Sequence, residues 1–266
     1  MNNTRTRRAT ADDLAAANLL CRDPGLHDHL QGAAARDADV VGHAMDTWAP
    51  HAASLLDAGC GTGTLVAALS DRLTCLGIDV QPQLIAHARH AHPNCDFEVG
   101  ELCTLDLGRT FDVITCLGNV LAYLHEPDEL HAATAAMSRH AHPGTILVIS
   151  TLVTPPPEAP ASTALVATPR GPAEVTVQNR WDVDTQIATM TRLWTFADQQ
   201  TETDIVHRRV HDLDALTTAL ASHGFQVRAA FDTLATTRNP PRGPSAFVIA
   251  QRPSADDGRT RRRPAR

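Results

Sequence analysis

The sequence predicts an α/β fold built on a doubly wound, mostly parallel β-sheet. Short apolar runs alternate with stretches of helical periodicity between residues 54 and 152, a pattern typical of a parallel sheet covered by helices on both faces. A glycine-rich turn connects the first strand of this region to its first helix. Beyond residue 172 the periodicity changes to two residues, which predicts an additional set of antiparallel strands.

The individual elements follow from these patterns. Residues 1–11 are polar and predict a disordered tail, and helices are expected over 12–20 and 29–48, separated by a break around Pro24-Gly25. The expected elements of the sheet region are strands over 54–57, 74–79, 96–99, 111–117 and 145–152, with helices over 64–73, 82–90 and 127–141. Pro143-Gly144 predicts a turn into the last of these strands.

The second half of the chain is expected to add an insertion at about 154–210. Residues 154–172 are rich in Pro, Ala and Thr and predict a loop. The remaining expected elements are antiparallel strands over 174–181, 187–196 and 204–210, a helix over 212–223 closed by Gly224, and strands over 225–231 and 246–250. A single domain over 12–251 is therefore expected, followed by a disordered basic tail over 252–266.

Composition excludes several classes of function. The 266-residue chain contains no lysine, which rules out Schiff-base chemistry and a lysine-dependent phosphate loop. Its net charge is −7, and the two ends hold nine of its 23 arginines, so the body between them is more acidic still, which argues against a nucleic-acid surface. Six scattered cysteines, no secretory signal pattern and no bilayer-length apolar run predict a cytoplasmic protein without a membrane partner.

The glycine-rich turn predicts a nucleotide-type binding loop. Gly59, Gly61 and Gly63 recur at every second position directly after the first strand, where missing Cβ atoms let a ligand approach the backbone. Asp79 ends the second strand, where a carboxylate can accept both hydroxyls of a ribose. The dinucleotide fingerprint needs a glycine where Thr64 stands, so the spacing disfavours that class of ligand.

Several motifs together resemble those of class I S-adenosylmethionine (SAM)-dependent methyltransferases. They are Leu56-Asp57-Ala58-Gly59-Cys60-Gly61-Thr62-Gly63, Gly77-Ile78-Asp79-Val80, Gly100-Glu101-Leu102, Phe111-Asp112-Val113-Ile114-Thr115-Cys116-Leu117 and Pro143-Gly144-Thr145. The resemblance implies a seven-stranded, Rossmann-like methyltransferase fold with SAM as cofactor and S-adenosylhomocysteine as product. In this family the inserted antiparallel strands form a lid over the substrate and often a dimer contact, so a homodimer through these strands is an expectation here.

The resemblance also implies a set of cofactor-binding residues. The three glycines would pass close to the methionine moiety, Asp57 would orient that region, and Asp79 would bind the ribose. Glu101 and Leu102 would bracket the adenine, and Cys116 or Leu117 would offer a backbone carbonyl to the methionine amine. The implied cofactor-binding set is Asp57, Gly59, Cys60, Gly61, Gly63, Asp79, Val80, Glu101, Leu102, Cys116 and Leu117. A helix cap or a strand-end acid without a ligand is the alternative for Asp57, and a solvated acid is the alternative for Glu101.

About residues 20–251 also resemble bacterial small-molecule methyltransferases, among them amino-sugar N,N-dimethyltransferases and relatives of glycine N-methyltransferase. Where the amino-sugar enzymes carry an active-site tyrosine near the N-terminus, this chain offers His27 or Gln31. Where they carry a histidine after the fourth strand, it has Tyr123. Tyr123 and His27 are accordingly the candidate catalytic residues, and the identity of the acceptor stays open.

Methyl transfer depends mainly on placing the nucleophile in line with the methyl–sulfur bond, and a hydroxyl nucleophile gains from a general base. Further candidates, chosen only for expected proximity, are His125, His207, Arg180, Trp181 and Trp194, with packing as the default for both tryptophans. His87, His90, His92 and Cys95 form the one metal-like cluster, but Pro93 interrupts it, so exposed histidines and no metal site are expected. Cys60 is expected to be a buried thiol rather than a nucleophile.

The sequence thus predicts methyl transfer from SAM to nitrogen or oxygen of a small-molecule acceptor, in bacterial secondary metabolism of the antibiotic type. Two alternatives stay open, a non-catalytic partner protein that retains the SAM fold and a methyltransferase acting on a macromolecule. The intact Asp57, Asp79 and glycines argue against the first, and the acidic body argues against the second.

Overall fold

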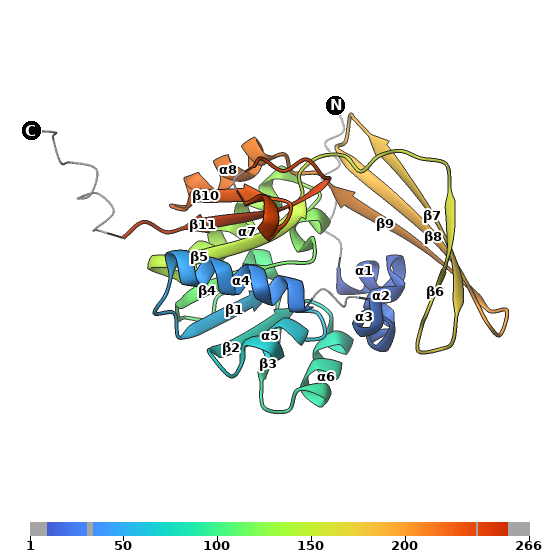
Figure 1. The fold of residues 1–266 in the computed structure, drawn as a ribbon, viewed down its shortest axis with the longest axis horizontal. Coiled ribbons are helices and arrows are strands. Elements are labelled where there is room, and N and C mark those ends of the chain that lie inside the picture. The colour runs from blue at the N-terminus through green and yellow to red at the C-terminus, as the bar shows by residue number, and fades with distance from the viewer. Residues whose placement is uncertain (1–9, 31–33, 238, 255–266) are drawn as a thin grey trace, which may run out of the picture.

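A computed structural model describes residues 10–30, 34–237 and 239–254 of the chain (Figure 1). Its centre is a seven-stranded sheet in the order β10-β11-β5-β4-β1-β2-β3. Strands β1 to β5 run parallel, whereas β11 runs antiparallel to both β5 and β10. The predicted doubly wound, mostly parallel sheet is therefore confirmed. Its strands are β1 Ser54–Ala58, β2 Thr74–Asp79, β3 Asp96–Val99, β4 Phe111–Cys116, β5 Ala141–Leu152, β10 Gln226–Phe231 and β11 Ser245–Gln251.

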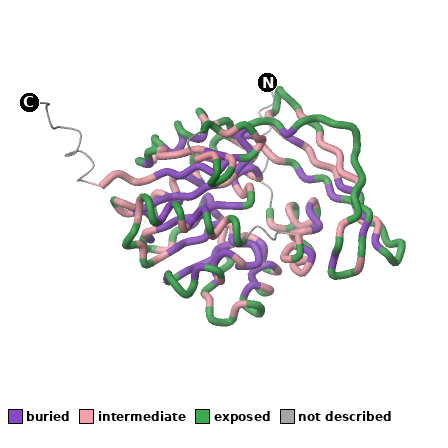
Figure 2. Tube along the Cα trace, viewed as in Figure 1, coloured by how far each residue is buried: buried purple, intermediate pink, exposed green. Residues whose placement is uncertain are grey.

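Helices cover both faces of this sheet, and each face has its own hydrophobic core. One core joins the sheet to the helices that carry Val41, Leu65 and Ile85. The opposite core joins it to the helices that carry Leu130 and Leu216. Because both faces are buried, the central strands are almost wholly inaccessible to water (Figure 2). The helices concerned are α4 Ala34–Trp48, α5 Thr64–Leu69, α6 Pro82–Ala91, α7 Pro127–Arg139 and α8 Leu213–Ser222.

A second, four-stranded antiparallel sheet, named here the lid sheet, lies to one side of the core (Figure 1). Its strands are β6 Ser162–Val166, β7 Ala173–Asp182, β8 Ile187–Phe196 and β9 Thr201–Arg209. The N-terminal helices, α1 Ala11–Ala17, α2 Leu19–Arg22 and α3 Pro24–Leu30, lie between the lid sheet and the core (Figure 1). They contact β9 on one side and α6 on the other.

Several predicted boundaries were wrong. Residues 154–172 were expected to be a loop, but they contain β6. The expected helix over 12–20 breaks at Asn18, and the expected break around Pro24-Gly25 instead begins α3. Strand β5 begins at Ala141, before the predicted turn, and Gly144 adopts a positive φ of 98° within it, where the register against β4 shifts. The short 3₁₀ helices are η1 Leu102–Thr104, η2 Val120–Tyr123 and η3 Leu234–Thr236.

The described residues at both ends of the chain contact their neighbours. Thr10 forms a capping box with Asp13 at the start of α1. Arg252 donates hydrogen bonds to the carbonyls of Ser138 and Ala141 and so belongs to the domain. The rest of both tails lies outside the described residues. All six cysteines are free thiols, and within the described ranges no helix is long and apolar enough to cross a bilayer.

Candidate active site

The glycine turn, the strand ends around it and the lid sheet enclose one cavity of about 320 Å³. The sheet order reverses between β1 and β4, and ligands of open α/β sheets bind at such a switch point, beyond the carboxyl ends of the strands. The cavity has two ends. The glycine end is lined by Asp57, Gly59, Gly61, Asp79 and Glu101, and the lid end by Asn18, Tyr123, Met190, Arg192 and Arg208.

The three glycines of the turn have different roles. All three adopt positive φ angles of 86°, 56° and 80° for Gly59, Gly61 and Gly63, which only glycine adopts without strain. Gly59 and Gly61 line the cavity. Gly63 instead caps α5, and a Cβ there would lie 2.5 Å from the ring of Phe97. Gly63 therefore allows close packing of the turn, and it lies outside the residues that line the cavity.

Asp79 is held by the backbone around it. One carboxylate oxygen accepts the N–H of Gly61 at 2.9 Å and the other accepts the N–H of Gln81 at 2.8 Å. Burial raises the pKa of this carboxyl, and the backbone hydrogen bonds act in the opposite direction. Each oxygen retains a second lone pair, so the fixed carboxylate can still accept hydrogen bonds from a ligand in the cavity.

Asp57 is the most deeply buried acid of the glycine end, with 3% of its surface exposed. Thr115 donates its hydroxyl to Oδ1 of Asp57 at 2.7 Å. Burial raises the pKa of Asp57 to about 7, and the negative charges of Asp79 and Asp37 add to the increase. A cationic group bound beside these carboxylates would reverse the effect, because opposite charge favours the ionised form.

The other predicted cofactor residues divide into two groups. Val80, Glu101, Leu102, Leu117 and Cys60 line the cavity, whereas Cys116 is fully buried and lies outside the lining. Glu101 also accepts the N–H of Cys103 and so caps η1. Burial raises the pKa of the Cys60 thiol well above its usual range, so this thiol is neutral, as the sequence predicted.

The lid end gathers polar side chains that the sequence did not connect. On β8 and β9, the residues Met190, Arg192, Asp204 and Arg208 occupy alternating positions and so share the inner face of the lid sheet. Arg192 pairs with Asp204 at 2.8 Å. Arg208 has no carboxylate partner among the described residues, and its Nε is buried without a hydrogen-bond partner.

Tyr123 and His27 both line the cavity, but they have different neighbours. The hydroxyl of Tyr123 lies 3.1 Å from Nδ2 of Asn18, at the lid end. His27 lies over the glycine turn, with Nδ1 at 3.3 Å from the hydroxyl of Thr62. Burial lowers the pKa of His27, so its ring is neutral at pH 7. Gln31, the other residue considered at this position, lies outside the described residues.

The remaining candidates lie away from the cavity. Trp194 is 2% exposed and packs within the lid sheet, as expected for a core residue. Trp181 and Arg180 border a separate recess. His125 lies outside the residues that line the cavity, and its Nε2 is 3.0 Å from the carbonyl oxygen of His207. Within the described part of the chain no three His, Cys, Asp or Glu side chains gather as metal ligands, and His87 instead pairs with Asp28 at 2.8 Å.

Comparison with known proteins bears on this arrangement. Residues 55–144 match the model of a family described as a methyltransferase domain. A solved structure of a SAM-bound amino pentose methyltransferase from Micromonospora echinaspora, involved in calicheamicin biosynthesis, superposes with a TM-score of 0.70 at 27% identity over 88% of this chain and 94% of that one. Residues 55–144 of this chain thus match a methyltransferase domain, and the described fold is shared with a SAM-bound methyltransferase structure.

The curated proteins to which the chain is similar include N,N-dimethyltransferases. One from Saccharopolyspora spinosa acts on dTDP-4-amino-2,3,4,6-tetradeoxy-D-glucose and is 34% identical over 129 residues, covering 47% of this chain and 52% of the relative. One from Streptomyces venezuelae acts on dTDP-3-amino-3,4,6-trideoxy-α-D-glucopyranose and is 29% identical over 43% of this chain and 49% of the relative. The chain thus spans about half the length of the curated relatives in these matches. The structure of DesVI from Streptomyces venezuelae shares the fold, with a TM-score of 0.72 at 21% identity over 90% of this chain and 98% of that one.

Sequence reasoning missed several residues that line the cavity from the N-terminal helices and the lid sheet. Asn18, Cys21 and Asp37 line it from the helices that precede the first strand. Met190, Arg192 and Arg208 line it from the lid sheet. The two-residue periodicity of β8 and β9 could have placed the last three on one face, but only the strand register shows which face meets the cavity.

Proposed function

We propose that this chain transfers a methyl group from SAM to a nitrogen of a small-molecule acceptor, and that the acceptor is a nucleotide-linked amino sugar. The observation that carries the proposal is the single cavity in which the carboxylates of the glycine end face the arginines of the lid end. The curated relatives act on amino sugars, which favours nitrogen over oxygen as the methyl-accepting atom.

The glycine end fits the cofactor. When bound, SAM supplies a methyl group on a positively charged sulfur, which a neutral amine displaces in line to leave S-adenosylhomocysteine. Asp79, fixed by two backbone N–H groups, would hold the ribose, and Asp57 would attract the cationic methionine end. Gly59 and Gly61 let protein side chains pack closely on the turn, since a Cβ on Gly59 would overlap Val120 and a Cβ on Gly61 would lie 3.1 Å from the ring of His27. Val80, Glu101 and Leu102 line the same cavity and would surround the adenine, and Leu117 is better placed than Cys116 to offer its carbonyl.

The lid end fits an acceptor that carries an anion. A buried guanidinium without a counter-ion costs several kcal/mol, and an anionic ligand group removes that cost. Arg208 is half-buried, its Nε is buried without a hydrogen-bond partner, and it has no carboxylate partner among the described residues, so part of this cost applies to it. The nucleotide-linked sugars of the curated relatives carry a diphosphate, which has the required charge.

The protein contributes mainly by positioning the reactants rather than by acid–base chemistry. A neutral amine needs no base before it attacks, so holding it in line supplies much of the rate. Tyr123 would contact the acceptor. His27 is neutral and lies over the glycine turn, so we propose that it helps to enclose the cofactor, and its predicted action on the acceptor stays a prediction.

An assay with purified chain, SAM and dTDP-4-amino-2,3,4,6-tetradeoxy-D-glucose tests the proposal. We expect release of S-adenosylhomocysteine and an N-methylated sugar, and no product from the analogue in which a hydroxyl replaces the amine. Asp79→Ala is expected to abolish binding of SAM in calorimetry, whereas Asp96→Ala, an exposed acid of β3, serves as the control. Transfer to RNA or protein, with none to any amino sugar, would instead favour the macromolecule alternative.

A further inference from the structure

Asn18 lies where the N-terminal helices, the lid sheet and the region after β4 meet. It is 6% exposed and stands at the break between α1 and α2. Its Oδ1 accepts the N–H of Leu20 at 3.0 Å and Nη2 of Arg192 at 2.8 Å. Its Nδ2 lies 3.1 Å from the hydroxyl oxygen of Tyr123. The side-chain amide of Asn18 therefore has partners on both of its polar atoms.

These contacts fix the orientation of the Asn18 amide. Two N–H donors, one from Leu20 and one from Arg192, converge on the same atom, which must therefore be the oxygen. The nitrogen then faces Tyr123, and an amide nitrogen has only hydrogens to offer. The hydroxyl oxygen of Tyr123 consequently accepts this hydrogen bond and retains its own proton for a different partner.

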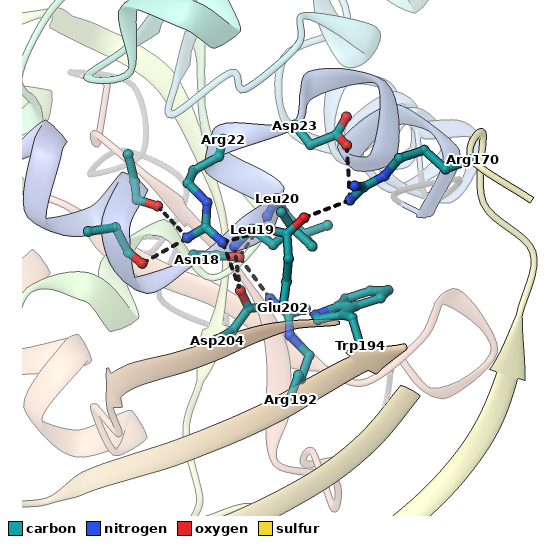
Figure 3. A network of polar contacts seen from close by, with 12 residues as sticks. Asn18, Leu19, Leu20, Arg22, Asp23, Arg170, Arg192, Trp194, Glu202 and Asp204 are labelled. Carbon is teal, nitrogen blue, oxygen red and sulfur yellow. Dashed lines mark hydrogen bonds and ion pairs between the residues drawn. The ribbon is translucent and has the colours of Figure 1, made fainter. Parts of the chain in front are cut away.

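A buried carboxylate prevents this arrangement from reversing. Asp204 is fully buried and accepts the N–H of Leu19 at 2.7 Å, Nε1 of Trp194 at 2.9 Å and Nη2 of Arg192 at 2.8 Å. Figure 3 shows Asn18, Arg192 and Asp204 joined in this network between α2 and the lid strands. Because Asp204 holds the guanidinium of Arg192, the donor that faces Asn18 stays in place.

We infer that Asn18 is a positioning residue that makes the hydroxyl of Tyr123 a hydrogen-bond donor to the acceptor molecule. Among the described residues no protein atom accepts the hydroxyl proton of Tyr123, and Tyr123 lines the cavity. Burial also raises the pKa of Tyr123, which keeps the proton on the phenol. Tyr123 therefore binds an oxygen or another lone pair of the acceptor and does not act as the general base. The inference rests on the proposed function only in naming what receives this proton.

Tyr123 is the only tyrosine in the chain, so its ionisation can be observed directly by ultraviolet absorption. Asn18→Asp keeps an oxygen for Leu20 and Arg192 but replaces the donor that faces Tyr123 by an acceptor. The phenol must then donate to the new carboxylate, so its absorption band should move to longer wavelength. The hydroxide concentration at which Tyr123 is half-ionised should rise at least about tenfold, because the carboxylate stabilises the neutral phenol.

Asn179→Asp on β7 is the matched control, since it makes the same substitution in the lid sheet outside the cavity, and it should change neither signal. An unchanged band and titration in Asn18→Asp would overturn the inference. If that variant does not fold, Asn18→Ser retains a hydroxyl oxygen that can cap α2, and it removes the amide that donates to Tyr123 and accepts from Arg192. The pKa of Tyr123 should again rise, because its phenolate loses a hydrogen bond, and an unaltered titration overturns the inference equally. Neither measurement needs cofactor or acceptor, so failure of the proposed function would appear separately, in the turnover assay.

Discussion

Lowering the pH is expected to weaken cofactor binding through Asp57. The methionine end of SAM or of S-adenosylhomocysteine carries an ammonium group, which an ionised Asp57 attracts and a protonated Asp57 does not. Burial holds the pKa of Asp57 at about 7 in the unliganded chain. Binding must therefore remove a proton from part of the population, and the affinity depends on pH in the range where that proton is still bound.

The size of the effect follows from the ionised fraction. With the pKa of Asp57 at about 7, that fraction falls from roughly one half at pH 7 to roughly one hundredth at pH 5, so the Kd should rise about fiftyfold. A carboxyl with an ordinary pKa of about 4 would change the Kd by less than about twofold over the same range. Burial also raises the pKa values of Asp79 and Asp37, which line the same cavity and would steepen the dependence at its acidic end.

Calorimetry with S-adenosylhomocysteine measures this without turnover, and titrations in buffers of different ionisation enthalpy count the released protons. Asp57→Asn should bind more weakly at pH 7 and lose most of the dependence between pH 6 and pH 7, while Asp96→Asn should behave as the wild type. The unliganded chain should show the opposite trend in stability. Because the folded-state pKa of Asp57 lies above its unfolded value, the contribution of Asp57 to the free energy of unfolding is complete below about pH 4 and is lost as the pH rises through about 7. A Kd that stays constant from pH 5 to pH 8 would refute the reasoning.

Three further substitutions test the roles assigned to particular contacts. Gly61→Ala should weaken binding of S-adenosylhomocysteine at least about tenfold, because its Cβ would lie 3.1 Å from the ring of His27 and would displace this cavity-lining side chain or the turn. Gly108→Ala has a similar positive φ of 64° with no neighbour within 4 Å and should bind normally. Gly63→Ala should instead lower the free energy of unfolding by about 2–4 kcal/mol in urea, because its Cβ would overlap Phe97; an unaltered midpoint would contradict that packing role. Asp204→Ala should lower the free energy of unfolding by about 3–5 kcal/mol, because it leaves Arg192 buried without its carboxylate. Glu202→Ala removes partly exposed ion pairs and should lower the free energy of unfolding by less than about 1 kcal/mol. Similar losses for both variants would argue against the buried network.

The glycine end of the cavity could be predicted from the sequence because its residues are contiguous motifs at strand ends. Asp57 and Asp79 each lie at the carboxyl end of a buried strand, and parallel strands bring such ends together without further information. Strands β2 and β3 also match their expected bounds, since apolar residues stop where the strand stops. Strand β6 was missed because its residues are almost all exposed and so show no apolar alternation.

The lid end could not be predicted, because its residues meet only through tertiary structure. Arg192 and Arg208 reach the cavity through the register of β8 against β9, and a shift by one residue would turn both away from it. Asn18 stands at a helix break within a stretch of helical propensity, and its partners Tyr123 and Arg192 lie more than 100 residues along the chain. Local patterns carry no information on such contacts.

The most direct test of the central claim is a reaction of the purified chain with SAM carrying an isotopically labelled methyl group and dTDP-4-amino-2,3,4,6-tetradeoxy-D-glucose. Mass spectrometry and NMR of the product identify the atom that carries the label. The account predicts the label on the sugar nitrogen, together with an equal amount of S-adenosylhomocysteine, and no transfer by Asp79→Ala. Label on an oxygen, or no transfer to any amino sugar by a chain that binds SAM, would contradict it.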